Sequence, residues 1–182
     1  EKRKGALRIL VLGGSLGAQQ FNIHLPKIFE LVNKTKKIII IHQSGEKHYD
    51  ELIKNYASRK LKVEIKEFIH DMNNKYEWAD LIIARSGALT VSEICEAGIA
   101  SILVPYPYAV DNHQLFNAKI IELRRGGYIV EQENMATKLV PILLKITRKE
   151  CMRKAVNAKS KKRQNPAEQI YNYCMKMVID EK

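Results

Sequence analysis

A chain of 182 residues that is 46% hydrophobic can bury the core of one domain, and nothing in it indicates a second core. It has no apolar run near the roughly 20 residues of a membrane-spanning helix and no cleavable leader, so we expect a soluble, unprocessed chain. The formal net charge of +11 would suit a nucleic-acid binder, but most of the excess lies between Lys145 and Gln164, where nine Lys or Arg face only Glu150.

This basic segment contains no aromatic residues and no helix-turn-helix or RNA-binding signature. We therefore favour a solvated or membrane-facing helix, suited to an anionic lipid surface, over a nucleic-acid site. The three cysteines, Cys95, Cys151 and Cys174, form no CxxC pair. We expect reduced thiols, as in the cytoplasm, with neither a metal site nor a disulfide.

Short apolar runs predict six strands, at residues 8–12, 37–42, 62–68, 81–84, 101–104 and 128–130. Helical spacing between them predicts helices at 19–32 (with a bend at Pro26), 47–56, 90–97, 113–125 and 137–147. Consecutive apolar residues at 38–41 and 81–84 are typical of strands buried on both faces of a parallel sheet. The alternation predicts a doubly wound, Rossmann-like α/β domain, and Asn165-Pro166 indicates a further helix to about Val178.

The first strand runs into Gly13-Gly14-Ser15-Leu16-Gly17, where glycines allow backbone N–H groups to approach an anion at a helix N-terminus. A tight turn without a ligand explains the loop about equally well. The spacing is not the GxGxxG fingerprint, and the second strand ends in His42-Gln43-Ser44-Gly45 without an acidic residue. Both observations argue against NAD.

The fourth strand ends in a second small-residue loop, Arg85-Ser86-Gly87-Ala88-Leu89, which opens the helix that carries Glu93. The Glu93 carboxylate could accept hydrogen bonds from both hydroxyls of a ribose at this edge of the sheet. The same residues also form an S/T-x-x-E capping box, Thr90 to Glu93, which by itself is the somewhat stronger interpretation.

Two further loops follow strands. After the fifth, Val104-Pro105-Tyr106-Pro107 leads to Asp111-Asn112-His113-Gln114, whose polar groups can read sugar hydroxyls or, with even weight, cap a helix. After the third, the turn from Phe68 to Met72 could place an apolar wall and a backbone amide beside a base, or belong to the core.

In order, these loops match GGSxGA, an FIxDM-like turn, RSGALTVSE and VPxP…DNHQ…NA, and over residues 7–132 the chain resembles the MurG family of glycosyltransferases. The resemblance implies that Ser15 and nearby amides hold a diphosphate, that Ile69 faces uracil, and that Glu93 binds the ribose. It implies that N-acetylglucosamine is read at His113, where some members carry Gln, and at Gln114. The remaining binding positions that it implies are Gly14, Gly17, Arg85, Ser86, Ala88, Leu89 and Thr90.

The family has two Rossmann-like halves of the GT-B type with the active site between them, and this chain resembles the second. The resemblance implies a UDP-N-acetylglucosamine domain over residues 1–148 and a basic helical segment, 149–182, that reaches toward the absent half. The absent half would hold the catalytic base, the lipid-linked acceptor and the membrane patch, so we place no catalytic residue here.

By the same resemblance the whole enzyme would be an inverting transferase at the cytoplasmic face of the bacterial membrane, making the disaccharide-bearing lipid precursor of peptidoglycan. The absence of a DxD motif indicates that it needs no metal or other cofactor. Two rivals remain: another enzyme of this architecture, such as a 2-epimerase or a glycolipid synthase, and a non-catalytic nucleotide-binding module. We expect no nucleic-acid partner.

Overall fold

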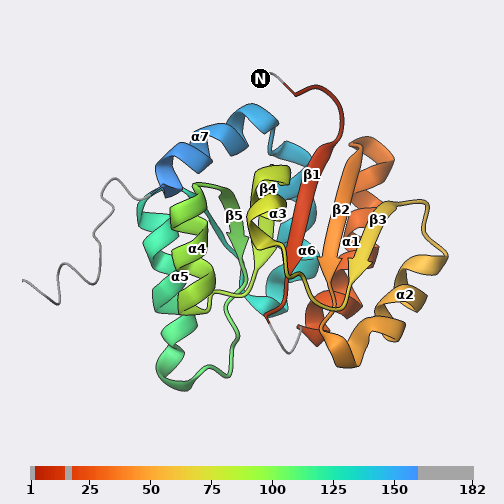
Figure 1. Cartoon of the computed structure of the whole chain (residues 1–182), viewed down its shortest axis with the longest axis horizontal. Coiled ribbons are helices and arrows are strands. Elements are labelled where there is room, and N and C mark those ends of the chain that lie inside the picture. Colours follow the sequence, from red (N-terminus) through yellow and green to blue (C-terminus); the bar gives the residue numbers. More distant parts are fainter. Residues whose placement is uncertain (1–2, 15–17, 160–182) are drawn as a thin grey trace, which may run out of the picture.

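The computed structural model describes residues 3–14 and 18–159, and these form one parallel sheet between two layers of helices (Figure 1). The sheet has the order β3-β2-β1-β4-β5-β6, and all neighbouring strands are parallel. The six predicted strands and the α/β class are confirmed, with strand ends shifted by no more than two residues. The strands are β1 (Leu7–Leu12), β2 (Ile38–Gln43), β3 (Lys62–Lys66), β4 (Leu81–Ala84), β5 (Ala100–Leu103) and β6 (Gly127–Ile129).

The five predicted helices are also confirmed. Short 3-10 turns precede three of them, and the structure adds two helices, α3 and α7, that were not predicted as separate elements. The helices are α1 (Gln19–Thr35), α2 (Tyr49–Ala57), α3 (Met72–Trp78), α4 (Ala88–Ala97), α5 (His113–Leu123), α6 (Met135–Lys145) and α7 (Arg148–Ala158). The 3-10 turns are η1 (Glu46–His48), η2 (Val110–Asn112) and η3 (Gln132–Asn134).

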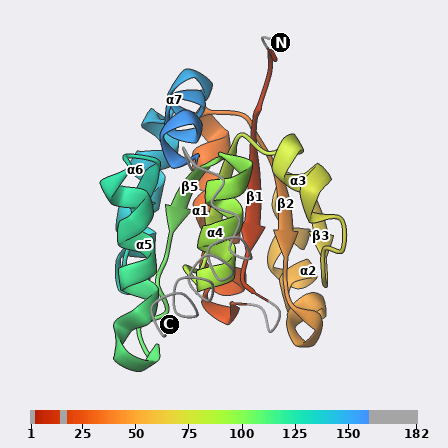
Figure 2. The same cartoon turned by 60° about the vertical axis from the view of Figure 1, so that its left-hand side comes forward.

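The two faces of the sheet carry separate hydrophobic cores. In β1, Ile9 belongs to the core under α1, α2 and α6, and its neighbour Leu10 belongs to the core under α3, α4 and α5. This alternation follows from the two-residue period of a strand, and it explains why the central strands carry apolar residues at consecutive positions, as β4 does throughout. Figure 2 shows the two helical layers on either side of the sheet.

Helix α1 continues through Pro26. A proline cannot donate the N–H that would bond to the carbonyl four residues earlier, that of Asn22. The Nδ2 of Asn55, on α2, donates to this carbonyl at 3.0 Å. The neighbouring helix therefore satisfies the group that Pro26 leaves free.

Part of the basic segment is built into the fold. Helix α7 lies over the end of the sheet where the strands begin (Figure 1), and its buried Cys151 and Ala158 belong to opposite cores. The Nζ of Lys154 is buried on α7, 3.9 Å from the centre of the Tyr128 ring. The predicted boundary at residue 148 stays a prediction, and the predicted helix after Asn165 lies outside the described residues.

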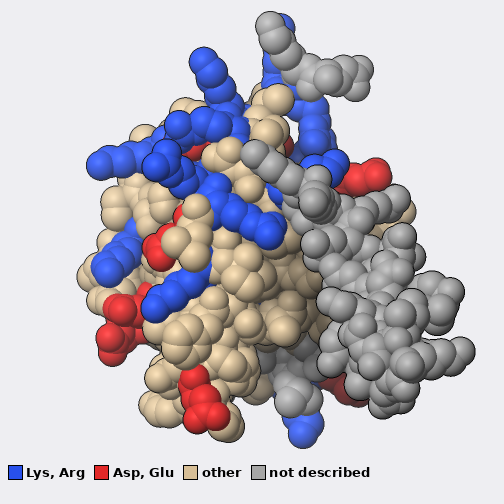
Figure 3. Space-filling view, turned by 90° about the vertical axis from the view of Figure 1, so that its left-hand side faces the viewer, with Lys and Arg blue, Asp and Glu red and all other residues tan. Residues whose placement is uncertain are grey.

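Lys and Arg side chains gather, on the face shown in Figure 3, toward the end of the molecule that carries α7. The carboxyl ends of the strands point the opposite way. Cys95 and Cys151 are free and buried, while Cys174 lies outside the described residues. Over residues 3–14 and 18–159, no helix is long and apolar enough to cross a membrane.

Candidate functional site

The chain reverses its winding direction between β1 and β4, which are neighbours in the sheet. Helix α1 follows β1 onto one face, whereas α4 follows β4 onto the other, so the loops after the two strands separate and leave a crevice. A cavity of about 590 Å³ opens there, which we call the switch-point cavity. Its lining comes from the loops and helix starts after the strands: Gly13, Gly14, Ala18, Gln19, Gln20, His48, Arg85, Gly87, Thr90, Tyr106, Tyr108, Gln114 and Gln132.

The glycine turn after β1 lies at one wall of this cavity. Gly14 has a φ of +86°, a conformation that side chains with a Cβ rarely adopt, and a Cβ built there would meet no atom within 4 Å. The backbone above Gly14 is therefore open to a ligand. Ser15 and Gly17, the other predicted phosphate contacts, lie outside the described residues.

Arg85 lines the cavity with a guanidinium that is mostly withdrawn from water; the residue is 9% exposed. Its Nη1 donates to the carbonyls of Val104 and Pro105 at 3.2 and 3.3 Å, and its Nη2 donates to Gln132. The guanidinium also lies over the ring of Phe21, 4.7 Å from its centre. Burial lowers the pKa of Arg85 to about 10, so the side chain stays charged at neutral pH.

None of these partners carries a negative charge, and within the described part of the chain no carboxylate pairs with Arg85. Burying a cation costs free energy unless an opposite charge accompanies it. The switch-point cavity therefore has a positive charge at its wall that suits an anionic ligand.

Fewer of the predicted binding residues after β4 line the switch-point cavity than expected. Ser86 is buried, and its Oγ donates to the Gln114 carbonyl at 2.8 Å, so it ties the loop to α5 and does not line the cavity. Ala88 and Leu89 are exposed on the first turn of α4 and also lie outside the lining. Thr90, one residue further along, does line the cavity.

The capping-box interpretation of Thr90 and Glu93 is wrong. Helix α4 begins at Ala88 with Gly87 as its N-cap, so Thr90 lies inside the helix, where it cannot act as the cap. The helix starts two residues earlier than predicted. The prediction missed this start because neither Gly87 nor Ala88 has a side chain that could cap the helix and so mark its beginning.

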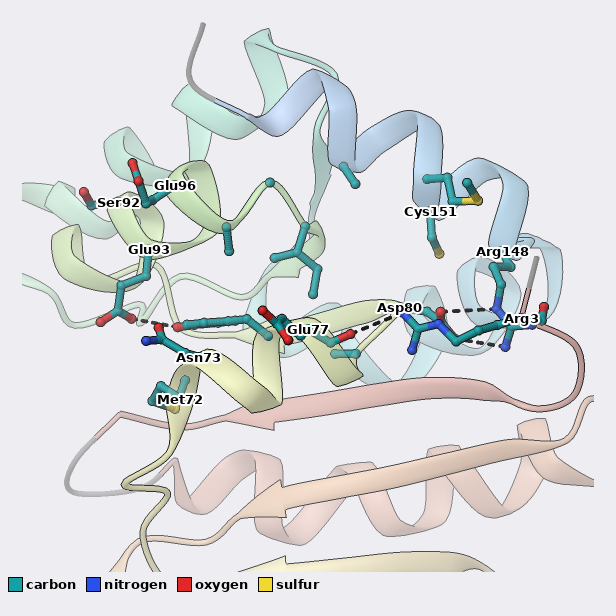
Figure 4. Close-up of a pocket in the computed structure, with 17 residues that line it drawn as sticks. Arg3, Met72, Asn73, Glu77, Asp80, Ser92, Glu93, Glu96, Arg148 and Cys151 are labelled. Atoms are coloured by element: carbon teal, nitrogen blue, oxygen red, sulfur yellow. Dashed lines mark hydrogen bonds and ion pairs between the residues drawn. The ribbon is translucent and has the colours of Figure 1, made fainter. Parts of the chain in front are cut away.

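Glu93 is exposed on α4, and its Oε2 accepts a hydrogen bond of 2.7 Å from the hydroxyl of Tyr76 on α3. Glu93, labelled in Figure 4, lies at one end of a second cavity, of about 780 Å³, which is lined by residues of α3, α4 and α7. It is not among the residues that line the switch-point cavity. Burial raises the pKa of Tyr76, and the hydrogen bond to Glu93 adds to the shift, so this phenol remains a donor. The predicted ribose carboxylate is thus oriented by a neighbouring helix.

The two predicted sugar readers take different positions at the start of α5. Gln114 lines the switch-point cavity, and its Oε1 accepts from the backbone N–H of Tyr106 at 2.9 Å. His113 is exposed, lies outside the lining, and its Nδ1 is 2.7 Å from the carbonyl of Val110. Asn112 is the N-cap of α5 but makes no side-chain capping bond, so capping does not explain this polar run.

The backbone that leads into α5 is strained. Asp111 and Asn112 both have a positive φ, of 50° and 52°, which costs free energy in residues other than glycine. Strained conformations of this kind gather at functional sites, and this one directly precedes the first turn of α5, where Gln114 lines the cavity.

Ile69 has its side chain buried in the core under α3, α4 and α5. For the Ile69 side chain, the interpretation that the turn from Phe68 to Met72 belongs to the core is therefore confirmed. Its backbone N–H donates to Oε1 of Gln43 at 3.1 Å, and Gln43 also contacts the glycine turn. Ile69 does not line the switch-point cavity, and because Gln43 already accepts from its N–H, only the remaining backbone groups around it are available to a base.

The structure thus brings Gly14, Arg85, Thr90 and Gln114 together around one cavity. It also shows residues that the sequence did not single out as site residues, namely Gln43, Tyr76, Tyr106 and Gln132. Gln43 was visible as a polar residue at the carboxyl end of a strand, but its partners are 29 and 26 residues away. Nothing in the described ranges groups three or more His, Cys, Asp or Glu in a way that could hold a metal ion.

Comparison with known proteins gives the same family from sequence and from structure. A UDP-N-acetylglucosamine–N-acetylmuramyl-(pentapeptide) pyrophosphoryl-undecaprenol N-acetylglucosamine transferase from Dechloromonas aromatica is 40% identical over 173 residues, covering 95% of this chain and 49% of that protein. The protein of the same name from Marinobacter nauticus is 40% identical over 176 residues, covering 95% and 48%.

The crystal structure of Acinetobacter baumannii MurG superimposes with a TM-score of 0.86 at 34% identity, covering 96% of this chain and 51% of that one. The chain therefore spans about half the length of these relatives. The family model for the glycosyltransferase family 28 C-terminal domain matches residues 8–170. The resemblance to MurG and the GT-B fold are confirmed, and the chain belongs to glycosyltransferase family 28 as its C-terminal domain.

Proposed function

We propose that this chain is the part of an inverting glycosyltransferase that binds UDP-N-acetylglucosamine. In the whole enzyme, N-acetylglucosamine would pass to the lipid-linked muramyl pentapeptide, the acceptor that the names of its relatives give. The observation that carries the proposal is Arg85, a buried cation at the wall of the switch-point cavity that pairs with no carboxylate of the described residues. A diphosphate supplies the missing negative charge.

The other residues of the cavity suit the remaining parts of such a molecule. The open backbone at Gly14 and the start of α1 favour the diphosphate, because N–H groups and the helix dipole attract anions. By the family resemblance Ser15 and Gly17 belong to the same contact. Gln114 offers an amide to sugar hydroxyls. Glu93 lines the neighbouring cavity and not the switch-point cavity, and by the family resemblance its carboxylate would bind the ribose.

The expected chemistry is a single displacement at the anomeric carbon. The acceptor hydroxyl attacks, the bond from this carbon to the diphosphate oxygen breaks, and the configuration inverts. Negative charge grows on the departing UDP, where Arg85 and the backbone donors stabilise it. We propose that no metal takes part, and that the base comes from the other half of the enzyme together with the acceptor site.

We further propose that the whole enzyme works at the cytoplasmic face of the membrane, where the lipid-linked acceptor would be presented. The positive charge at the α7 end of the molecule supports this proposal, since it suits an anionic lipid surface.

Calorimetric titration of the 182-residue chain with UDP-N-acetylglucosamine, UDP, ADP and uridine tests the proposal. UDP should bind more tightly than uridine, because the diphosphate meets Arg85, and more tightly than ADP. Equal binding of UDP and ADP would favour a general nucleotide-binding module. Sugar transfer to the lipid-linked acceptor should require the added N-terminal half, and turnover by this chain alone would show that the base has been misplaced.

A further inference from the structure

Gln43, the last residue of β2, connects two loops at the carboxyl edge of the sheet. Its Nε2 donates to the carbonyl of Gly14 at 3.0 Å, and its Oε1 accepts from the N–H of Ile69 at 3.1 Å. The residue is 5% exposed. One side-chain amide thus joins two backbone segments that are far apart in the chain.

The position of Gln43 in the sheet explains how it reaches both segments. β2 lies between β1 and β3, and Gln43 is level with Leu12 at the end of β1 and with Lys66 at the end of β3. The glycine turn leaves from the first of these strands and the Ile69 loop from the second. A side chain at the end of β2 is therefore placed between the two loops.

The chemistry of the contact requires an amide. The Gly14 carbonyl needs a donor, whereas the Ile69 N–H needs an acceptor, and glutamine carries both on one rigid group. An ionised glutamate has no donor, and methionine, of similar length, offers neither a donor nor a strong acceptor.

We propose that Gln43 is a positioning residue of the nucleotide site. Its amide holds the backbone of Gly14, which we assign to the diphosphate, at a set distance from the backbone of Ile69, the position that the family resemblance gives to the base. A nucleotide has a fixed reach from base to diphosphate through its ribose, so the two loops bind it well only when their separation matches that reach. Gln43 acts in this way without touching the ligand. The inference rests on the proposed function, because the nucleotide gives each loop its role.

Asn33 provides a matched control at the opposite end of the strands, where β2 and β3 begin. Its side-chain amide also joins two backbone segments, donating to the Lys60 carbonyl at 3.2 Å and accepting from the Ile38 N–H at 3.2 Å. Replacing either amide removes the same two kinds of hydrogen bond. Only the bonds of Gln43 connect loops of the proposed site.

The test measures the dissociation constants of uridine and UDP for the wild-type chain and for Gln43→Met, Gln43→Glu and Asn33→Leu. Gln43→Met should weaken UDP binding about tenfold, as expected when two net hydrogen bonds that shape a site are lost. Gln43→Glu keeps the acceptor for Ile69, so uridine should bind nearly as in the wild type, while the gain in affinity from uridine to UDP should shrink. Asn33→Leu should leave both constants unchanged.

The titrations are made well below the melting temperature of each variant, which separates affinity from stability. If Gln43→Met does not fold, Gln43→Asn takes its place, since the shorter side chain keeps an amide but cannot span both loops. Unchanged UDP affinity in a folded Gln43 variant, or an equal loss in Asn33→Leu, would overturn the inference and leave the proposed function standing. Failure of the wild-type chain to bind UDP would overturn both.

Discussion

The two edges of the sheet each hold an arginine that is largely withdrawn from water, and they differ in what surrounds it. At the amino edge, Nη2 and Nε of Arg148 bind the two carboxylate oxygens of Asp80 at 3.1 and 3.2 Å, and Nη2 also donates to the carbonyl of Ala6. At the carboxyl edge, the acceptors that Arg85 meets among residues 3–14 and 18–159 are all neutral. The described part of the fold neutralises the first charge and provides no counter-charge for the second.

The comparison shows how to separate groups that stabilise a fold from groups that act on a ligand. Asp80 has only 5% of its side chain exposed, and it accepts a further hydrogen bond from the backbone of Arg8, so its pair with Arg148 joins α7 to the start of the sheet. Arg85 has no such charged partner in the part of the chain that the structure describes. Substitutions at the two edges should therefore change different measurements.

The largest effect is expected from Asp80→Asn. The asparagine keeps the shape of the side chain but leaves Arg148 without a counter-charge, which should lower the free energy of unfolding by about 3 kcal/mol. Urea denaturation measures this change. The affinity of the folded variant for UDP should equal that of the wild type, and a reduced affinity would mean that the two edges are coupled.

Arg85→Met should reduce the affinity for UDP, in contrast to Asp80→Asn, which should reduce stability. Methionine retains packing against Phe21 but removes the charge, so UDP should bind about 10 to 100 times more weakly. This corresponds to a loss of about 1.4 to 2.8 kcal/mol in binding free energy. Uridine should lose much less, because it has no diphosphate. Arg59→Met, which breaks a surface ion pair with Glu30, is the control and should leave both affinities as they are. Equal losses for UDP and uridine would remove Arg85 from the diphosphate contact.

The sequence predicted only in part which residues stabilise the fold and which lie at the candidate site. Apolar runs such as residues 38–41 identified the central strands, because a parallel strand buried on both faces has little choice of residue. The order of loops after those strands then brought Gly14, Arg85 and Gln114 to one edge. These predictions rest on local patterns. The structure confirms the strands and places the three residues around one cavity, and their roles in binding stay predictions.

Other features depend on contacts between distant residues and left no local signal. Helix α3 has seven mostly polar residues and buries only Tyr76, so it shows no helical periodicity. The roles of Gln43 and of Asp80 arise from partners in other elements. The interpretation of Glu93 stayed open for a local reason. The start of α4 at Ala88 has no side-chain cap, so the sequence could not show that Thr90 lies inside the helix.

Gly14 and Gly5 allow a smaller test of the same comparison. Both have a positive φ, of +86° and +102°, with no atom within 4 Å of an added Cβ, but Gly14 lies at the cavity and Gly5 before β1. Alanine at either position should cost about 1 to 2 kcal/mol of stability through backbone strain. Only Gly14→Ala should also weaken UDP binding, because its methyl group blocks approach to the backbone. Equal UDP affinity in the two variants would argue against the diphosphate assignment of this turn.

The smallest expected effect concerns the hydroxyl that orients Glu93. Tyr76→Phe removes one hydrogen bond to the Glu93 carboxylate and leaves the ring in the core, so affinity for UDP should fall by about 0.5 to 1.5 kcal/mol. Affinity for 2′,3′-dideoxy-UDP should not fall, because that compound has no ribose hydroxyls for Glu93 to bind. Tyr56→Phe is the control, since its hydroxyl makes a similar buried contact of 2.9 Å with His42 under the other helical layer. It should lose stability and keep the wild-type ratio of the two affinities. If Tyr76→Phe also keeps that ratio, Glu93 does not read the ribose through this orientation, and its hydrogen bond with Tyr76 only joins α3 to α4.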